Sequence, residues 1–287
     1  MTKLPIALQL YSIREDVKAD MAGSLAKVKE LGYDGVEIFD TDAMGTSAAD
    51  MAKLCAEVGL VCISAHVPFE KLVKNPSGMV RYYSEAGVKY IAIPYLGNDH
   101  RPGGAKFAET IEGLRLIGEA ARERDITLLY HNHDFEFQMV DGKYGLDVLF
   151  DSVSADMLQC EIDTCWVKVA GEKPADYVLK YTGRTPIVHV KDYVGGSSDK
   201  MYPIPAPPPV PEYDENGDLI PKEPAAPTMA HMPFQFRPLG TGCQDIPAIV
   251  SAAEAAGAVW LVVEQDEATP GKSAISCAAE SLKFLKS

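Results

Sequence analysis

The sequence has no CxxC pair, no long apolar run and fewer basic than acidic residues. Its six cysteines are widely spaced and several lie within apolar stretches, so we expect buried free thiols rather than a zinc-finger or disulfide framework. No apolar run approaches the roughly 20 residues that cross a bilayer, and we expect no membrane association. The opening residues, MTKLPIALQLYSI, show no signal-peptide cleavage pattern, which favours a cytoplasmic protein.

The charge balance also limits the class of partner. The 41 acidic and 27 basic residues give a formal net charge of −14. Proteins that bind a polyphosphate backbone usually present a basic surface, so we expect no nucleic-acid partner. No GxGxxG motif follows the first expected strand, which weighs against a dinucleotide-binding domain.

What the sequence does contain is a repeated unit in which a glycine at a helix end leads into a β-rich run. LGYDGVEIF, VGLVCISAHV, AGVKYIAIPY and AGAVWLVVEQ are the clearest examples. The apolar runs alternate little, as is typical of parallel strands buried on both faces. The expected strands are residues 6–13, 35–39, 61–67, 90–95, 127–133, 158–165, 187–192 and 260–265.

Stretches with apolar residues three or four positions apart separate these strands and predict helices. They are residues 17–31, 47–58, 79–86, 104–124, 174–181, 244–256 and 273–286. Eight such units in series favour a (β/α)8 TIM barrel over an open sheet. We therefore predict a single barrel domain that spans residues 1–287.

A proline-rich segment, residues 194–238, interrupts the pattern after the seventh strand. It includes MYPIPAPPPVPEYDENGDLIPKEPAAP, carries no helical or strand period and is too long for an ordinary connection. It belongs to the rim on which barrel active sites form. We expect either a disordered insertion or an ordered loop that covers the pocket or contacts a neighbouring subunit in a homo-oligomer. In the ordered case Phe234, Phe236 and Arg237 would lie near the pocket.

Four residues that could bind a metal or act on a substrate each lie just past an apolar run. Glu136, Asp163, His189 and Glu264 occur in TLLYHNHDFEF, LQCEIDTCW, PIVHVKDY and WLVVEQDE, respectively. Parallel barrel strands would bring them to one rim. Three carboxylates and one imidazole suit Mn²⁺, Mg²⁺ or Co²⁺, and Zn²⁺ is also compatible. The pattern therefore predicts one divalent metal ion.

Three of these residues have plain structural alternatives. Asp163 could instead cap the helix that follows its strand. His189 could be an ordinary buried histidine. Glu264 follows the apolar run WLVV, where an unpaired carboxylate is costly, so a lysine or arginine could be its partner.

The fifth expected strand offers two kinds of ligand. Strict alternation puts Glu136 on the opposite face from His131 and His133, so the chain must bend after His133 for Glu136 to reach the site. Without that bend, His131 or His133 is the metal ligand from this strand. The two imidazoles share a face, and in a pocket they could hold hydroxyl groups or move protons near neutral pH.

Other polar and aromatic residues at strand ends are candidates for substrate contact, although structural roles are equally open to them. Lys191 shares the face of His189 and could pair with a substrate oxygen anion, and Trp166 could form an apolar pocket wall. The remaining candidates are Glu37, His66, Arg237 and either Gln9 or Tyr11.

With these motifs placed, nearly the whole chain resembles the xylose isomerase-like barrel superfamily, in particular its sugar phosphate isomerase/epimerase branch. GYDGVEIF, SAH, YHNHDFEF, EIDTCW, HVKDY and VEQDE carry the resemblance. It implies that Glu136, Asp163, His189 and Glu264 hold one divalent metal. It also implies that a glutamate removes a proton next to a carbonyl, that an enediolate forms, and that a second acid returns the proton. His131 or His133 could take one of these proton-transfer roles.

The resemblance implies a small-molecule carbohydrate substrate and leaves several activities open. Related branches are lyases of 3-oxo-glycosides and dehydratases of ketoinositols, and a barrel that binds sugar without turnover is a further alternative. Endonucleases of abasic DNA share the superfamily, but they use several zinc ions and many histidines, whereas this chain has six histidines and is acidic. No glycine-rich phosphate cradle is present, so we expect an unphosphorylated sugar or keto-sugar.

Overall fold

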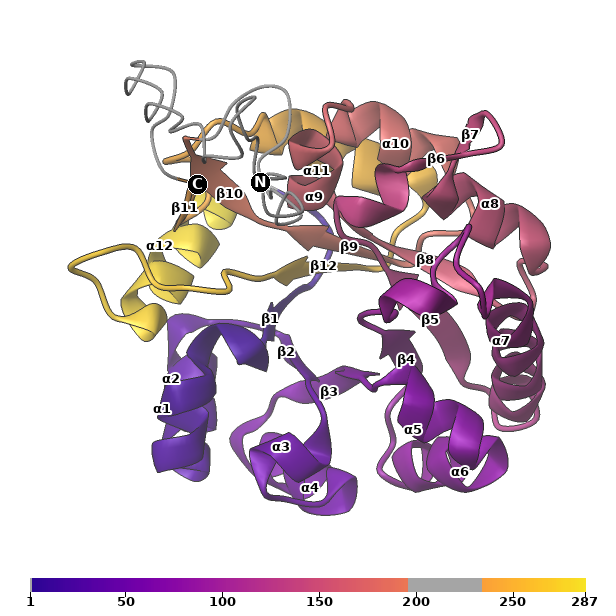
Figure 1. Ribbon diagram of the computed structural model, residues 1–287. Helices are drawn as coiled ribbons and strands as arrows, with labels where there is room; N and C mark the ends of the chain where they lie inside the picture. Colours follow the sequence, from indigo (N-terminus) through magenta and orange to yellow (C-terminus); the bar gives the residue numbers. More distant parts are fainter. Residues whose placement is uncertain (1, 196–233) are drawn as a thin grey trace, which may run out of the picture.

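The computed structural model describes residues 2–195 and 234–287, which form a closed parallel barrel ringed by helices (Figure 1). The strands adjoin in the order β1-β12-β9-β8-β5-β4-β3-β2. This confirms the predicted (β/α)8 fold. The barrel strands are β1 (Ile6–Gln9), β2 (Gly35–Ile38), β3 (Val61–His66), β4 (Tyr90–Ile93), β5 (Thr127–His131), β8 (Gln159–Asp163), β9 (Ile187–Val190) and β12 (Trp260–Val263).

Every barrel strand lies within a predicted range, and each ends earlier than expected. The largest difference is at the first strand, where Leu10–Ile13 forms a 3-10 helix instead of continuing β1. The side chain of Gln9 accepts a hydrogen bond from the backbone N–H of Tyr11, which caps this turn. Strand pairing in β1 therefore ends at Gln9.

The outer layer contains the seven predicted helices, with one division. Residues 17–31 are not one helix, because Asp20 adopts an extended conformation and accepts a hydrogen bond from the N–H of Gly23. Asp20 thus caps a second helix. The helices are α1 (Arg14–Ala19), α2 (Met21–Leu31), α3 (Thr41–Met44), α4 (Ala48–Val58), α5 (Phe69–Lys74), α6 (Pro76–Glu85), α7 (Phe107–Arg122), α8 (Gly145–Ser152), α9 (Thr164–Val169), α10 (Pro174–Lys180), α11 (Ile246–Ala256) and α12 (Ala274–Lys286).

The side chains inside the barrel are apolar at one level and polar two residues further along the strands. A buried apolar cluster fills its lower part and consists of Ala7, Ile63, Ala92, Leu129, Ile187 and Val262. Side chains two residues apart on a strand share a face. Two residues after four members of that cluster come Gln9, His131, His189 and Glu264. The site is therefore built directly on the apolar floor of the barrel.

The ends of the proline-rich segment are ordered, which corrects the prediction of an irregular backbone throughout residues 194–238. β10 (Asp192–Val194) pairs with β11 (Gln235–Arg237) as an antiparallel ribbon. The Asp192 carboxylate accepts hydrogen bonds from four backbone N–H groups, three of them after β11, and so ties β10 to the segment that follows β11. Residues 196–233 of the segment lie outside the described residues.

A second ribbon was also not predicted: β6 (Met139–Val140) pairs with β7 (Lys143–Tyr144) before α8. All six cysteines are free thiols, and five are buried, as expected; Cys243 is exposed. In the described ranges no helix has both the length and the apolar character needed to cross a bilayer.

Candidate metal centre

Four buried side chains meet at the carboxyl ends of the barrel strands: His131, Asp163, His189 and Glu264. Each offers one ligand atom, and these atoms all lie within 4.8 Å of one another. We call this set the rim quartet. It contains three of the four metal ligands predicted from the sequence, with His131 in the position expected for Glu136.

The distances in the rim quartet match neighbouring ligands around one ion. His131 Nε2 lies 3.3 Å from Asp163 Oδ2, and His189 Nδ1 lies 2.9 Å from Glu264 Oε2. Two ligands bound at about 2.1 Å are separated by about 3 Å in common coordination geometries. Asp163 Oδ2 is ion-paired with Lys191, while both ring nitrogens of His131 have no hydrogen-bond partner among the described residues. Buried atoms of this kind rarely stay unsatisfied, so the set suits a divalent metal.

Asp163 caps the helix that follows its strand and still presents one oxygen to the rim quartet. Its Oδ1 accepts hydrogen bonds from the backbone N–H groups of Cys165 and Trp166, at 2.9 and 3.2 Å, and so caps α9. Its Oδ2 turns toward His131 and Lys191. The cap fixes the carboxylate and leaves one oxygen for the site.

Lys191 balances much of the negative charge at the rim. Its Nζ lies 3.0 Å from Asp163 Oδ2, 2.9 Å from Glu264 Oε2 and 3.2 Å from Asp266 Oδ1. Burial is the largest single influence and raises the pKa of Asp163 and of Glu264, but the Lys191 ammonium together with His131 and His189 outweighs it, and both pKa values lie below their usual range. Burial raises the pKa of Asp266 to about 7. Lys191 is thus the cationic partner that Glu264 was expected to need.

Glu136 lies outside the rim quartet. Its carboxylate accepts hydrogen bonds from the hydroxyl of Tyr130 and, at 2.8 Å, from the backbone N–H of His133. Burial raises its pKa to about 7. The chain turns into a 3-10 helix, Phe135–Phe137, after the strand, and this turn directs Glu136 to the Tyr130 side of β5 rather than into the barrel. The structure thus brings His131, and not Glu136, to the other predicted ligands.

His133 lies beside the quartet in an aromatic stack. Its ring is parallel to that of Phe135 at 5.2 Å and close to that of Trp166 at 5.5 Å. Burial, reinforced by the neighbouring His131, lowers its pKa well below the usual range. His133 is therefore a neutral imidazole near pH 7, held in a fixed orientation.

A cavity of about 840 Å³ opens above the rim quartet. His131, Glu264, Lys191, His133 and Trp166 line its lower part, and Tyr11 lies at its exposed mouth. Arg237 is not among its lining residues in the described part of the chain; its guanidinium donates to the Gln235 side chain at 2.6 Å. Trp166 packs against Phe234 and Phe236, so the ribbon reaches the cavity through this tryptophan.

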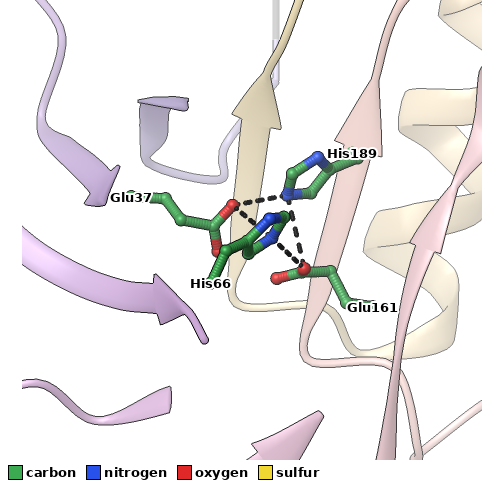
Figure 2. A group of neighbouring side chains, drawn as sticks. All are labelled: Glu37, His66, Glu161 and His189. Carbon is green, nitrogen blue, oxygen red and sulfur yellow. Dashed lines mark hydrogen bonds and ion pairs between the residues drawn. The ribbon is translucent and has the colours of Figure 1, made fainter. Parts of the chain in front are cut away.

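A second group of four side chains lies beneath the first and shares His189 with it: Glu37, His66, Glu161 and His189 (Figure 2). We call this set the deep quartet. His66 also lines the cavity, whereas Glu37 is completely buried. Glu161 was missed by the sequence analysis. Its position two residues before Asp163 in QCEID, on the same face of β8, is the pattern that could have revealed it.

Comparison with known proteins finds a partial match in sequence. An inosose dehydratase of Clostridium perfringens is 30% identical over 81 residues, which is 28% of this chain and 27% of that protein. The curated relatives are thus matched over about a quarter of their length.

The fold extends over whole solved structures. A sugar phosphate isomerase/epimerase of Parabacteroides distasonis superposes with a TM-score of 0.76 at 19% identity, covering 100% of this chain and 94% of the other. The IOLI protein with a bound zinc atom superposes with a TM-score of 0.67 at 15% identity, covering 98% and 96%. The model of the xylose isomerase-like TIM barrel family matches residues 25–287, and the chain belongs to that family.

Proposed function

We propose that this protein is a divalent-metal-dependent isomerase or epimerase of a sugar or keto-sugar. The observation that carries the proposal is the rim quartet, whose four ligand atoms converge on one point and whose His131 and Glu264 side chains line a cavity. A divalent ion held there would polarise a carbonyl group and acidify the neighbouring C–H bond. Two carboxylates and two imidazoles suit Mn²⁺, Co²⁺ or Zn²⁺, and Mn²⁺ is our first choice.

His133 is the base that we propose for proton removal. It lines the cavity, and because its pKa is lowered the ring is unprotonated near pH 7 and its lone pair is free. Its stacking between Phe135 and Trp166 fixes the direction in which its ring nitrogens point. A substrate C–H placed against His133 would therefore meet a base in a set orientation.

Lys191 stabilises the negative charge that proton removal creates. Its ammonium lies at the floor of the cavity, and the three carboxylates around it raise its pKa well above the usual range despite burial. A permanent positive charge next to an enediolate oxygen lowers the energy of that anion. Asp266, whose pKa is raised to about 7, lies 3.2 Å from this ammonium and is positioned to return a proton.

The cavity favours an unphosphorylated substrate. Basic and acidic side chains both line it, so no part of the lining is purely basic; they are Arg14, Arg101, Lys191, Asp40, Asp134, Glu264, Asp266 and Glu267. Arg101 is stacked on Phe135, with its guanidinium carbon 3.4 Å from the ring centre. A neutral sugar with many hydroxyl groups fits such a mixed lining better than a phosphate ester does.

A second candidate activity is that of a dehydratase or lyase on a ketoinositol or 3-oxo-glycoside. The partial similarity to the inosose dehydratase favours it. The same proton abstraction starts this reaction, but a substituent on the next carbon then leaves as water or an alcohol.

One experiment distinguishes these activities. The Mn²⁺-supplemented protein is incubated in D2O with a panel of keto-sugars, keto-inositols and 3-oxo-glycosides and followed by NMR. Solvent deuterium at a carbon next to the carbonyl, with the substituents retained, supports the isomerase or epimerase. Loss of water or of an alcohol supports the dehydratase or lyase.

Two variants serve as controls for that experiment. His133→Ala should remove the exchange. His100→Ala should not, because His100 is hydrogen-bonded to Thr110 outside the quartets. If no substrate in the panel exchanges or reacts, the catalytic proposal is wrong and a sugar-binding barrel becomes the better account.

A further inference from the structure

The deep quartet has the geometry of a cation site of its own (Figure 2). His66 Nε2 lies 2.7 Å from Glu161 Oε2 and 3.1 Å from Glu37 Oε2. His189 Nε2 lies 2.7 Å from Glu37 Oε2 and 3.6 Å from Glu161 Oε2. Four ligands bound to a tetrahedral zinc ion at about 2.0–2.1 Å are separated by about 3.3 Å. The observed separations scatter around that value.

The deep quartet also contains two buried carboxylates whose negative charge a cation would balance. Glu37 and Glu161 are completely buried, and Glu37 Oε1 and Glu161 Oε1 have no hydrogen-bond partner among residues 2–195 and 234–287. The Gln9 side-chain amide donates to Glu37 Oε2 but carries no charge. Two buried carboxylates are costly unless positive charge accompanies them; protons on His66 and His189, which contact both carboxylates, supply it in the metal-free protein, and one divalent ion would take their place.

We propose that Glu37, His66, Glu161 and His189 form a second divalent-cation site, beneath the rim quartet. Two imidazoles and two carboxylates without a thiolate suit Zn²⁺ or Co²⁺ in a tetrahedral arrangement. His66 lines the cavity while the other three side chains are completely buried, so an ion would enter past His66.

His189 connects the two quartets through its two ring nitrogens. Nδ1 faces Glu264 of the rim quartet at 2.9 Å, and Nε2 faces Glu37 of the deep quartet at 2.7 Å. A neutral imidazole has one lone pair for a metal and one N–H to donate. An ion bound by Nε2 leaves Nδ1–H to donate to Glu264, and an ion bound by Nδ1 leaves Nε2–H to donate to Glu37. The two sites therefore exclude each other, and the chain holds one ion at a time.

Cobalt binding to the metal-free full-length chain tests this inference without any assay of activity. The D163N/E264Q variant removes the two carboxylates of the rim quartet and leaves the deep quartet intact. The E37Q/E161Q variant removes the two carboxylates of the deep quartet and leaves the rim quartet intact. We expect one Co²⁺ per chain, by elemental analysis, in the wild type and in each double variant, and none when all four changes are combined. Cobalt in D163N/E264Q should show the intense visible absorption of tetrahedral coordination.

The outcomes separate this inference from the proposed function. If D163N/E264Q binds no cobalt while the wild type binds one ion, the deep site is overturned and the rim site stands. If D163N/E264Q binds one ion and a folded E37Q/E161Q binds none, the deep site is supported and the rim site falls. Two ions in the wild type would support the deep site but overturn mutual exclusion, and no ion in the wild type would overturn both sites. Circular dichroism checks folding, and D163N/E264Q alone decides the matter if E37Q/E161Q does not fold.

Discussion

His131 Nε2 and Asp163 Oδ2 face each other at 3.3 Å across adjoining strands of the barrel, and His131 Nε2 has no hydrogen-bond partner in the described residues. Burial lowers the pKa of His131, so the ring is neutral at pH 7 and offers a lone pair. A neutral nitrogen and a carboxylate oxygen at this distance are suited to share a metal ion. This pair is the reason for assigning the ligand of β5 to His131.

The first prediction compares the two histidines of that strand. His131→Ala removes a ligand and should lower Mn²⁺ affinity by about 10- to 100-fold or more, in line with the loss of groups that hold a metal. His133→Ala leaves all four ligands of the rim quartet in place and should bind Mn²⁺ within a few-fold of the wild type. Isothermal titration of both variants checks this. Weak binding by His133→Ala together with wild-type binding by His131→Ala would contradict the assignment.

The second prediction concerns the pH dependence that Glu136 introduces. Burial raises the pKa of Glu136 from an ordinary 4.5 to about 7, so the folded state favours the protonated acid. The resulting stabilisation is present below pH 4.5 and is lost as the pH rises through 7. Between pH 5 and 8 the wild type should lose on the order of 2 kcal/mol of unfolding free energy relative to Glu136→Gln. Chemical denaturation at both pH values measures this difference.

The opposite pH dependence of stability would identify Glu136 as a metal ligand. A metal ion bound to its carboxylate would lower the pKa instead. If the wild type in the presence of Mn²⁺ gains stability relative to Glu136→Gln between pH 5 and 8, Glu136 is a ligand after all.

Much of the fold could be predicted because glycine-ended helices and apolar strand runs are local patterns. Asp163, His189 and Glu264 could be found for the same reason, since each directly follows such a run. The placement of Glu136 could not, because it depends on a tight turn after His131 and on the hydroxyl of Tyr130. Strict alternation gave the correct face for His131.

The deep quartet and the β10-β11 ribbon are two further features that were not predicted from the sequence. The sequence signal for Glu161 is its spacing of two residues before Asp163, and its partners become evident when the histidines of β3 and β9 are placed beside it. The β10-β11 ribbon joins short segments on either side of a proline-rich stretch. Its stability comes from the Asp192 carboxylate and not from a periodic pattern in the sequence.

The third prediction concerns Lys191. Its removal in Lys191→Met leaves the buried carboxylates of Asp163 and Glu264 without a cation and should destabilise the metal-free protein by about 3–5 kcal/mol. Added Mn²⁺ should restore most of this loss, because it supplies the missing charge. Lys168→Met is the matched control, since Lys168 is exposed on α9. Thermal melts of both variants with and without Mn²⁺ measure the loss and its recovery. If metal-free Lys191→Met is as stable as Lys168→Met, Lys191 does not balance the negative charge at the rim.

The fourth prediction concerns the anchor of the ribbon. Each carboxylate oxygen of Asp192 accepts hydrogen bonds from two backbone N–H groups. Asp192→Asn replaces one of these oxygens with an NH2 group, which donates hydrogen bonds and cannot accept them. Each backbone N–H left without an acceptor should lower the free energy of unfolding by about 1–3 kcal/mol. Asp245→Asn is the control, because Asp245 caps α11 through one N–H and asparagine caps a helix equally well. Denaturant melts should show a clear loss for Asp192→Asn only; equal stability of the two variants would exclude the anchoring role.

The most direct test of the central claim is an anomalous-difference map from crystals of the wild-type protein grown with Mn²⁺. We predict one peak within about 2.0–2.3 Å of ligand atoms from His131, Asp163, His189 and Glu264. The absence of a peak among these four side chains, or a peak bound by Glu136 instead of His131, would contradict the claim.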